Sequence, residues 1–154
     1  MHHSKPIQTS SIRGSNRALN VTDTSPATAS KTHFPPSRWG QHMTIKIVSF
    51  SYRRGAPPRG AAVVDCRELP NPHSVIALRS LDGRDPRVRQ WLLAEGFGTW
   101  IKLCTAGTLL AKKGHLVACG CIAGQHRSVA VAEMIAEALR VGGREVRVEH
   151  TALS

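Results

Sequence analysis

A buried strand that turns directly into a helix is the feature that most constrains this chain. Residues 116–121 (LVACGC) form an apolar run, and residues 127–141 carry apolar side chains at helical spacing, among them Ala130, Met134 and Ala138. A short turn of this kind leaves the first N–H groups of the helix without partners, and these donors attract an anion together with the helix dipole. The stretch therefore predicts an α/β fold with an anion site at the start of the helix.

Further strands and helices are expected to alternate along the chain. Asp85 followed by Pro86 is typical of a helix start, because an N-cap is followed by proline in the first turn. Strands interleaved with helices predict an α/β layered domain with a small, largely parallel four-stranded sheet flanked by helices. Ligands of such sheets bind beyond the carboxyl ends of the strands. The expected strands are 45–50, 61–66, 116–121 and 145–149, the expected helices begin at 86 and cover 99–113 and 127–141, and loops cover 51–60 and 67–73.

The first 42 residues differ from the rest. They are rich in Ser, Thr, Asn and Pro, hold five basic residues against one acid, and lack apolar periodicity, so a disordered tail is predicted for 1–42. Met43 opens the first strand, which leaves an over-extended start and a transit peptide as alternatives for this segment. The folded domain is expected to be 43–154.

The charge of the chain favours anionic partners. Its net charge is +11, and the part from residue 43 onward contributes most of it, with sixteen Lys and Arg residues against nine Asp and Glu. Such a charge suits nucleic acid, acidic membranes or phosphorylated metabolites. The four cysteines lack paired metal-ligand spacing, so reduced thiols in a cytoplasmic protein are expected, with no metal and no cofactor. No run of eighteen apolar residues exists, and no membrane partner is expected.

The residues of the turn match the chemistry of a phosphoryl group. Gly124 lets the backbone approach a ligand, Arg127 supplies a planar fork for two phosphate oxygens, Ser128 adds a hydroxyl and His126 a switchable charge. Sulfate and carboxylate are the mimics of such a ligand. The alternative is that the glycines only make a tight connection between strand and helix.

The same turn raises the alternative of a cysteine-dependent phosphatase. The pattern Cys-x-x-Gly-x-x-Arg-Ser beginning at Cys121 resembles the loop in which a thiolate attacks phosphorus and an arginine holds the transition state. Gly120 stands where those enzymes usually carry histidine, and only Asp82 and Asp85 are candidates for a general acid. A cysteine that ends a buried strand is also commonly a core residue.

Five strings in order resemble one known family over residues 47–153. They are SFSYRRGAP, VVDCRELPNPH, LRSLDGRDPRV, GCIAGQHRSVAVAEMIAEAL and VRVEHTAL. Together they are similar to the C-terminal domain of the RapZ (YvcJ-type) family of RNase adapters and nucleotide-binding proteins. The resemblance implies a pocket for a phosphorylated metabolite, an amino-sugar phosphate in one member, and an RNA-binding surface that presents small RNA to a ribonuclease.

The family's first domain is an ATP- or GTP-binding P-loop domain, and this sequence has no G-x-x-x-x-G-K-[ST] motif. ATPase and GTPase activity are therefore not expected, and the domain resembles a stand-alone copy of the second domain. A non-catalytic binding module is the main hypothesis. An RNA-binding regulatory adapter, a homo-oligomer and a separate regulatory protein partner are left as open alternatives.

By position, the resemblance places further residues at the ligand. Each has a simpler interpretation: Asp65 can pair with Arg67 or cap a turn, His73 can be a surface histidine, and Arg53 and Arg54 can be solvated charges. The complete candidate ligand-binding set is Arg53, Arg54, Asp65, Arg67, His73, Arg79, Cys121, Gly124, Gln125, His126, Arg127 and Ser128.

The sequence departs from the family pattern at the turn and at its end. Ile122 and Ala123 stand where the family often has threonine and glycine, and Gln125 stands where it often has lysine. A different ligand is therefore an open alternative. The chain ends in HTALS without the family's basic tail, so a weaker phosphate-driven affinity for RNA is expected.

Overall fold

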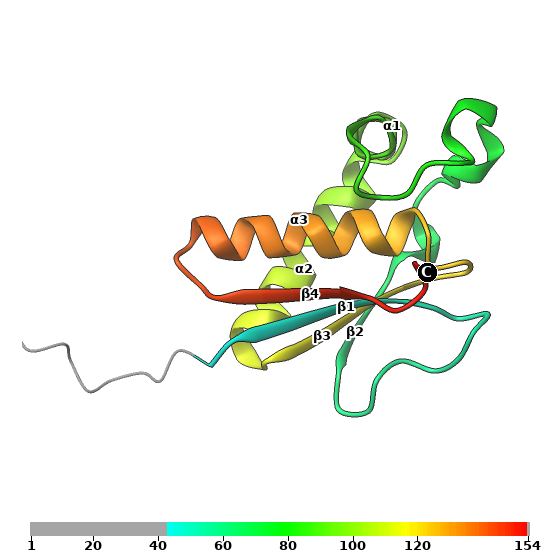
Figure 1. Ribbon diagram of the computed structural model, residues 1–154. Helices are drawn as coiled ribbons and strands as arrows, with labels where there is room; N and C mark the ends of the chain where they lie inside the picture. The colour runs from blue at the N-terminus through cyan, green and yellow to red at the C-terminus, as the bar shows by residue number, and fades with distance from the viewer. Residues whose placement is uncertain (1–42, 154) are drawn as a thin grey trace, which may run out of the picture. The chain divides into compact units, whose positions relative to one another are not determined.

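A parallel sheet of four strands forms the centre of the domain (Figure 1). The computed structural model describes residues 43–153. The strand order is β2-β3-β1-β4, and every neighbouring pair is parallel, which confirms the predicted α/β fold. The strands are β1 (Ile45–Ser51), β2 (Ala62–Asp65), β3 (Leu116–Cys121) and β4 (Val146–His150).

Helices connect the strands and pack against the sheet. Helix α3 (Arg127–Val141) runs along β1 and β4 in Figure 1, while α2 (Phe97–Lys113) lies beside α3 and against β2. Three short 3-10 helices precede them, η1 (Cys66–Glu68), η2 (Pro72–Ser74) and η3 (Ile76–Leu78). The α-helices are α1 (Pro86–Glu95), α2 (Phe97–Lys113) and α3 (Arg127–Val141).

The bounds of β3 and α3 are those that the sequence predicts, and β1 and β4 differ from the prediction by one residue at their ends. Two 3-10 helices, η1 and η2, overlap the ends of the predicted extended loop at 67–73. The Asp65 carboxylate accepts a hydrogen bond from the backbone N–H of Arg67, which caps η1, and Pro72 fixes the first residue of η2. The prediction for residues 1–42 lies outside the described residues. Within the described part, the helices are too short or too polar to cross a bilayer.

Helix α2 packs closely against the rest of the core at Gly107. A methyl group built on this glycine would lie 2.2 Å from the end of the Ile135 side chain on α3 and 3.4 Å from Val64 on β2. Ile135 is fully buried and has little room to move. The missing side chain therefore lets α2 and α3 lie side by side.

Gly107→Ala is expected to lower the free energy of unfolding by about 1–2 kcal/mol, because overpacking a dense core outweighs the higher helix propensity of alanine. Urea unfolding of the full chain measures the effect. Gly98→Ala in the same helix is the control, since its methyl group would meet nothing within 4 Å. A destabilisation of equal size in both variants would contradict the packing explanation.

Candidate functional site

The carboxyl ends of β1 and β3 bring two loops of the sequence together. Ser51 is paired with Cys121 at the end of the two strands, and the backbone N–H of Arg53 donates to the carbonyl of Ile122 at 3.2 Å. The Ser51 hydroxyl donates to the same carbonyl at 2.7 Å. The loop of residues 122–126, called the anion loop below, is therefore fixed beside Arg53 and Arg54.

The anion loop can take its course only because Gly124 has no side chain. Its φ is +74°, in the left-handed region, and a methyl group there would lie 2.4 Å from Cβ of Ala152 and 2.9 Å from Cβ of Ser51. Gly120, the residue before Cys121, packs equally closely: a methyl group there would lie 2.5 Å from the ring of Phe50. The histidine that cysteine-dependent phosphatases usually carry at this place has no room here.

The loop and the first turn of α3 present unpaired backbone donors. Among the described residues, none accepts a hydrogen bond from the backbone N–H groups of residues 122–129. The donors at the start of α3 point beyond the end of the helix, where the dipole adds positive potential. An anion in front of α3 would satisfy several of them at once.

A segment between η3 and α1 holds the anion loop from the other side. The Gln125 side-chain amide donates to the carbonyls of Arg79 and Leu81, at 3.1 and 2.6 Å. The backbone N–H of Gly83 donates back to the Gln125 carbonyl at 2.9 Å. Gln125 therefore uses its amide nitrogen to fix the loop, and its side chain still lines both hollows described below.

Arg127 is a buried cation without an acidic partner. Arg127 is the first residue of α3, and it is only 9% exposed. One terminal nitrogen, Nη1, donates to the carbonyls of Arg67 and Leu69, at 3.1 and 3.0 Å, and no described carboxylate forms an ion pair with it. No fully buried side-chain nitrogen of the described part lacks a partner, so the other two nitrogens of Arg127, which have none there, are not fully buried. Arg127 also lines one of the hollows described below.

His126 is buried directly before Arg127 and remains neutral near pH 7. Its Nε2 lies 3.0 Å from the carbonyl of Leu78, to which the neutral ring donates its proton. Burial lowers the pKa of His126, and the nearby His73 and Arg127 lower it further, against the opposing effects of the Leu78 carbonyl and Asp82. Burial, supported by the positive charge nearby, therefore keeps this ring uncharged.

Cys121 closes the floor of the site next to Ser128. The thiol and the hydroxyl lie 3.2 Å apart, and both residues are buried. Cys121 still contributes to the lining of a hollow, together with Arg127. The Cys121 thiol therefore lies at the base of the anion loop, on the side of the hollow.

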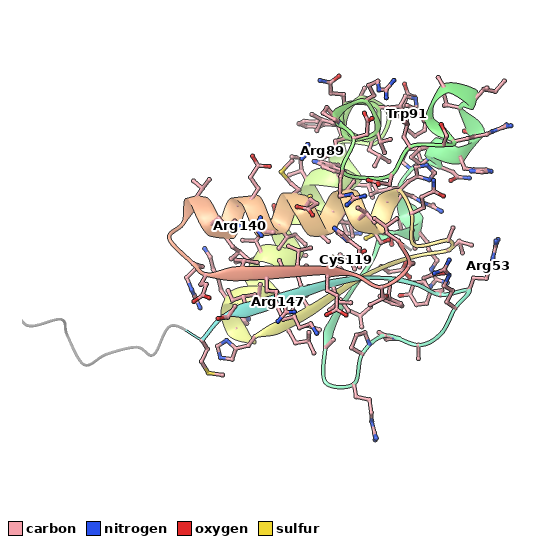
Figure 2. All side chains as sticks on the ribbon, in the orientation of Figure 1. Arg53, Arg89, Trp91, Cys119, Arg140 and Arg147 are labelled. Carbon is pink, nitrogen blue, oxygen red and sulfur yellow. The ribbon has the colours of Figure 1, made fainter. Side chains whose placement is uncertain are left out.

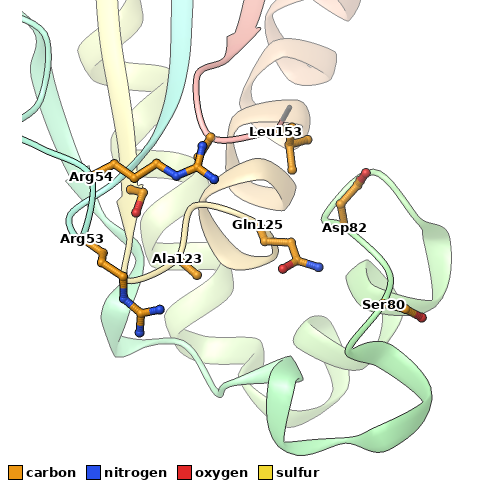
Figure 3. Close-up of a pocket in the computed structure, with 9 residues that line it drawn as sticks. Arg53, Arg54, Ser80, Asp82, Ala123, Gln125 and Leu153 are labelled. Carbon is orange, nitrogen blue, oxygen red and sulfur yellow. The ribbon is translucent and has the colours of Figure 1, made fainter.

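Two hollows adjoin the anion loop and share Arg53, Ala123 and Gln125 in their walls. The first, about 500 Å³, is drawn in Figure 3, where Arg53 and Arg54 lie on one side of Gln125 and Ser80 and Asp82 on the other. The second, about 320 Å³, lies over Cys121. The first hollow is lined by Ser51, Arg53, Arg54, Ser80, Asp82, Ala123, Gln125, Ala152 and Leu153, and the second by Arg53, Asn71, His73, Cys121, Ile122, Ala123, Gln125, His126 and Arg127.

Arg53 and Arg54 belong to the open side of the site. Both are exposed, and neither side chain has a hydrogen-bond or ion-pair partner in the part of the chain that is described. Figure 2 shows Arg53 projecting at the end of the sheet where the anion loop lies, whereas Arg140 and Arg147 lie toward the other end. The guanidinium group of Arg53 therefore borders both hollows, and that of Arg54 borders the first.

Five predicted residues do not line the two hollows, namely Asp65, Arg67, Arg79, Gly124 and Ser128. Asp65 and Arg67 form an ion pair at 2.6 Å, whose hydrogen bonds lower the pKa of the Asp65 carboxyl, and Arg67 also stacks over the Tyr52 ring at 4.3 Å. Arg79 donates to the carbonyl of His73 at 2.8 Å, which shapes the loop that carries His73. These contacts match the simpler interpretations of Asp65 and Arg67.

Several wall residues were not predicted from the sequence to bind a ligand, namely Ser51, Asn71, Ser80, Ala152 and Leu153. Asp82 was predicted only as a candidate general acid. The Asp82 carboxylate is bound by Arg84 at 2.7 Å, mainly through hydrogen bonds that lower its pKa. The described residues include no cluster of three or more His, Cys, Asp or Glu side chains that fits a metal ion.

The neutral state of His126 predicts a pH-dependent stability. Because its pKa is lower in the folded chain than the ordinary value of about 6.5, its contribution is complete above that pH and is lost as the pH falls from there toward the folded pKa. His126→Gln is expected to flatten this part of the curve of unfolding free energy against pH, measured by urea titration. His115→Gln, at an exposed position, should leave the slope unchanged; equal slopes in all three proteins would refute the assignment.

Comparison with known proteins places this site in a family. The model of the RapZ C-terminal domain matches residues 43–154. A nucleotide-binding protein of Frankia casuarinae is 43% identical over 117 residues, which are 70% of this chain and 40% of that protein. Similar proteins of the same description occur in Ruegeria sp. (strain TM1040), 40% identical over 78% of this chain and 42% of the relative, and in Cereibacter sphaeroides, 35% identical over 89% and 50%. The chain thus spans half or less of the length of these relatives, and it belongs to the RapZ C-terminal domain family.

Proposed function

We propose that this chain is a binding module for a phosphorylated small molecule, which it holds at the anion loop without transforming it. The observation that carries the proposal is that Arg127 is nine-tenths buried with no carboxylate partner among the described residues. It begins the helix at whose start the backbone N–H groups also have no acceptor in that part of the chain. A buried cation is costly unless an anion compensates it. A phosphate in the second hollow would supply that anion.

The family relationship supports a ligand of this class. The relatives are described as nucleotide-binding proteins, and a nucleotide shares its phosphate group with the ligand proposed here. This chain covers less than two thirds of their length, so the activity of the whole relatives does not transfer to it without a test.

The walls of the first hollow favour a polar body on the ligand. Ser80 and Asp82 offer a hydroxyl and a carboxylate group opposite Arg53 and Arg54. A carboxylate accepts hydrogen bonds from hydroxyl or ammonium groups. A sugar phosphate with an amino group matches this distribution, with its phosphate toward the anion loop and its ring toward Asp82.

Arg53→Ala and Arg54→Ala are expected to weaken the binding of the preferred sugar phosphate by about tenfold each, because a charged hydrogen bond contributes about 1.5–3 kcal/mol and an exposed one less. Calorimetric titration of the full chain with glucose and glucosamine phosphates, nucleotides and inorganic phosphate measures the affinities. Arg59→Ala is the matched control, since Arg59 is exposed in the same loop but lines neither hollow.

Failure of every phosphate to bind the folded wild-type chain would refute the proposal. The salt dependence separates a small ligand from RNA, the alternative partner: RNA affinity should fall steeply between 50 and 200 mM salt, whereas a pocket that holds one phosphate should change much less. Binding of RNA alone would move the function from the pocket to the basic surface.

A cysteine-dependent phosphatase is the second candidate, and the 3.2 Å contact between the Cys121 thiol and the Ser128 hydroxyl favours it. In that reaction the thiolate displaces the alcohol from phosphorus, and water then cleaves the phosphocysteine. Against it, no Asp or Glu side chain lines the second hollow, and Nη1 of Arg127 is bound to backbone carbonyls.

We expect no turnover of p-nitrophenyl phosphate by the wild-type chain above the level of Cys121→Ser, and comparable phosphate affinity in the two proteins. Continuous absorbance measurement over pH 5–8 tests this. Turnover that Cys121→Ser abolishes, with binding retained, would establish the phosphatase and contradict a purely binding role.

A further inference from the structure

A chain of three polar side chains lies between the sheet and α3. The Ser49 hydroxyl on β1 lies 2.7 Å from Nδ1 of His150 at the end of β4. The other ring nitrogen, Nε2, lies 2.8 Å from a carboxylate oxygen of Glu133 on α3. With the neutral ring, Ser49 donates to Nδ1 and Nε2 donates to Glu133, so each group is satisfied.

The order serine, histidine, carboxylate is that of a hydrolase triad, but its location excludes that role. Ser49 is fully buried, with 0% exposure, and it lies within the strand rather than at its end. A nucleophile must be within reach of its substrate. The three side chains therefore serve another purpose.

The contacts of the residues that follow His150 indicate that purpose. Thr151 donates from both its backbone N–H and its hydroxyl to the carbonyl of Ser49, each at 3.0 Å. Ala152 is buried against Gly124, and Leu153 lines the first hollow. Figure 1 shows the C-terminal end of the chain beside the anion loop. Residues 151–153 thus run from the polar chain directly onto the loop.

We propose that Glu133, His150 and Ser49 are positioning residues, which anchor residues 151–153 so that Ala152 holds Gly124 and presets the anion loop for its ligand. The anchor has physical weight because Glu133 and His150 are mostly buried, with side-chain exposures of 26% and 12%. Removing one partner leaves the other with an unsatisfied polar group. The part of this proposal that concerns ligand binding rests on the proposed function.

The anchor acts on the anion loop at a single residue, Gly124. The other contacts described above hold the residues on either side of Gly124. Ser51 holds the carbonyl of Ile122, and Gln125 is held by the segment after η3. Gly124, between them, has its close contacts with Ala152 and Ser51. A displaced Ala152 would therefore remove the closer of these two contacts from the residue at the centre of the loop.

Glu133→Ala, Glu133→Gln and Glu137→Ala test the proposal in the full chain. Glutamine keeps an acceptor for Nε2 of His150, and Glu137 lies one turn further along α3 with its side chain 62% exposed. In the folded proteins, we expect Glu133→Ala to move the amide NMR signal of Gly124 and to weaken inorganic phosphate binding by about tenfold. Glu133→Gln and Glu137→Ala should resemble the wild type in both measurements.

Ala152→Gly provides a second test that leaves the polar chain intact and should also weaken phosphate binding. The proposal is overturned if Glu133→Ala, or Ala152→Gly where Glu133→Ala does not fold, leaves both the Gly124 signal and phosphate affinity unchanged. It is also overturned if Glu137→Ala changes them as much as Glu133→Ala. Should the wild type bind no phosphate, a Gly124 signal displaced in Glu133→Ala and restored in Glu133→Gln would support the anchor and refute only the proposed function.

Discussion

The buried guanidinium of Arg127 connects the parts on which the site depends. Arg127 is the first residue of α3, and its guanidinium donates to the carbonyls of Arg67 and Leu69, which holds the segment that follows β2. The carbonyls satisfy one nitrogen but do not neutralise the charge. Asp65, whose carboxyl pKa is lowered mainly by hydrogen bonds from Arg67 and less by Arg127, is already bound by Arg67. The domain thus keeps a positive charge in its interior, next to N–H groups that have no acceptor among the described residues.

Neighbouring contacts keep that charge available and keep the anion loop in shape. His126 stays neutral in the same positive field, so it adds no second charge to be compensated. Gly124 packs on Ala152, Ser51 binds the Ile122 carbonyl, and Gln125 binds the segment after η3. A loop held from three directions is preorganised, and binding then requires little ordering of the protein. The proposed role of Glu133, His150 and Ser49 is to supply one of these three directions.

Much of the fold could be predicted because its signals are local. The apolar run at β3 and the helical spacing in α3 determine both elements without reference to the rest of the chain, and the glycine turn between them indicates the anion loop. The acceptors of Arg127 could not be predicted, since they lie 60 and 58 residues away in sequence. The place of Asp82 in the wall of the first hollow could not be predicted for the same reason. The hydrogen bonds of Gln125 with Leu81 and Gly83 join segments that are distant in sequence, and such bonds leave no periodic pattern in it.

The most direct test of an anion site at this loop is an NMR titration of the full chain with inorganic phosphate. The account predicts saturable shifts of the backbone amide signals of residues 122–129, since these N–H groups have no acceptor in the described part of the chain. The side-chain Nε–H signal of Arg127 should shift with the same dissociation constant. Unchanged signals in this segment, or shifts that are confined to exposed arginines elsewhere and do not saturate, would contradict it.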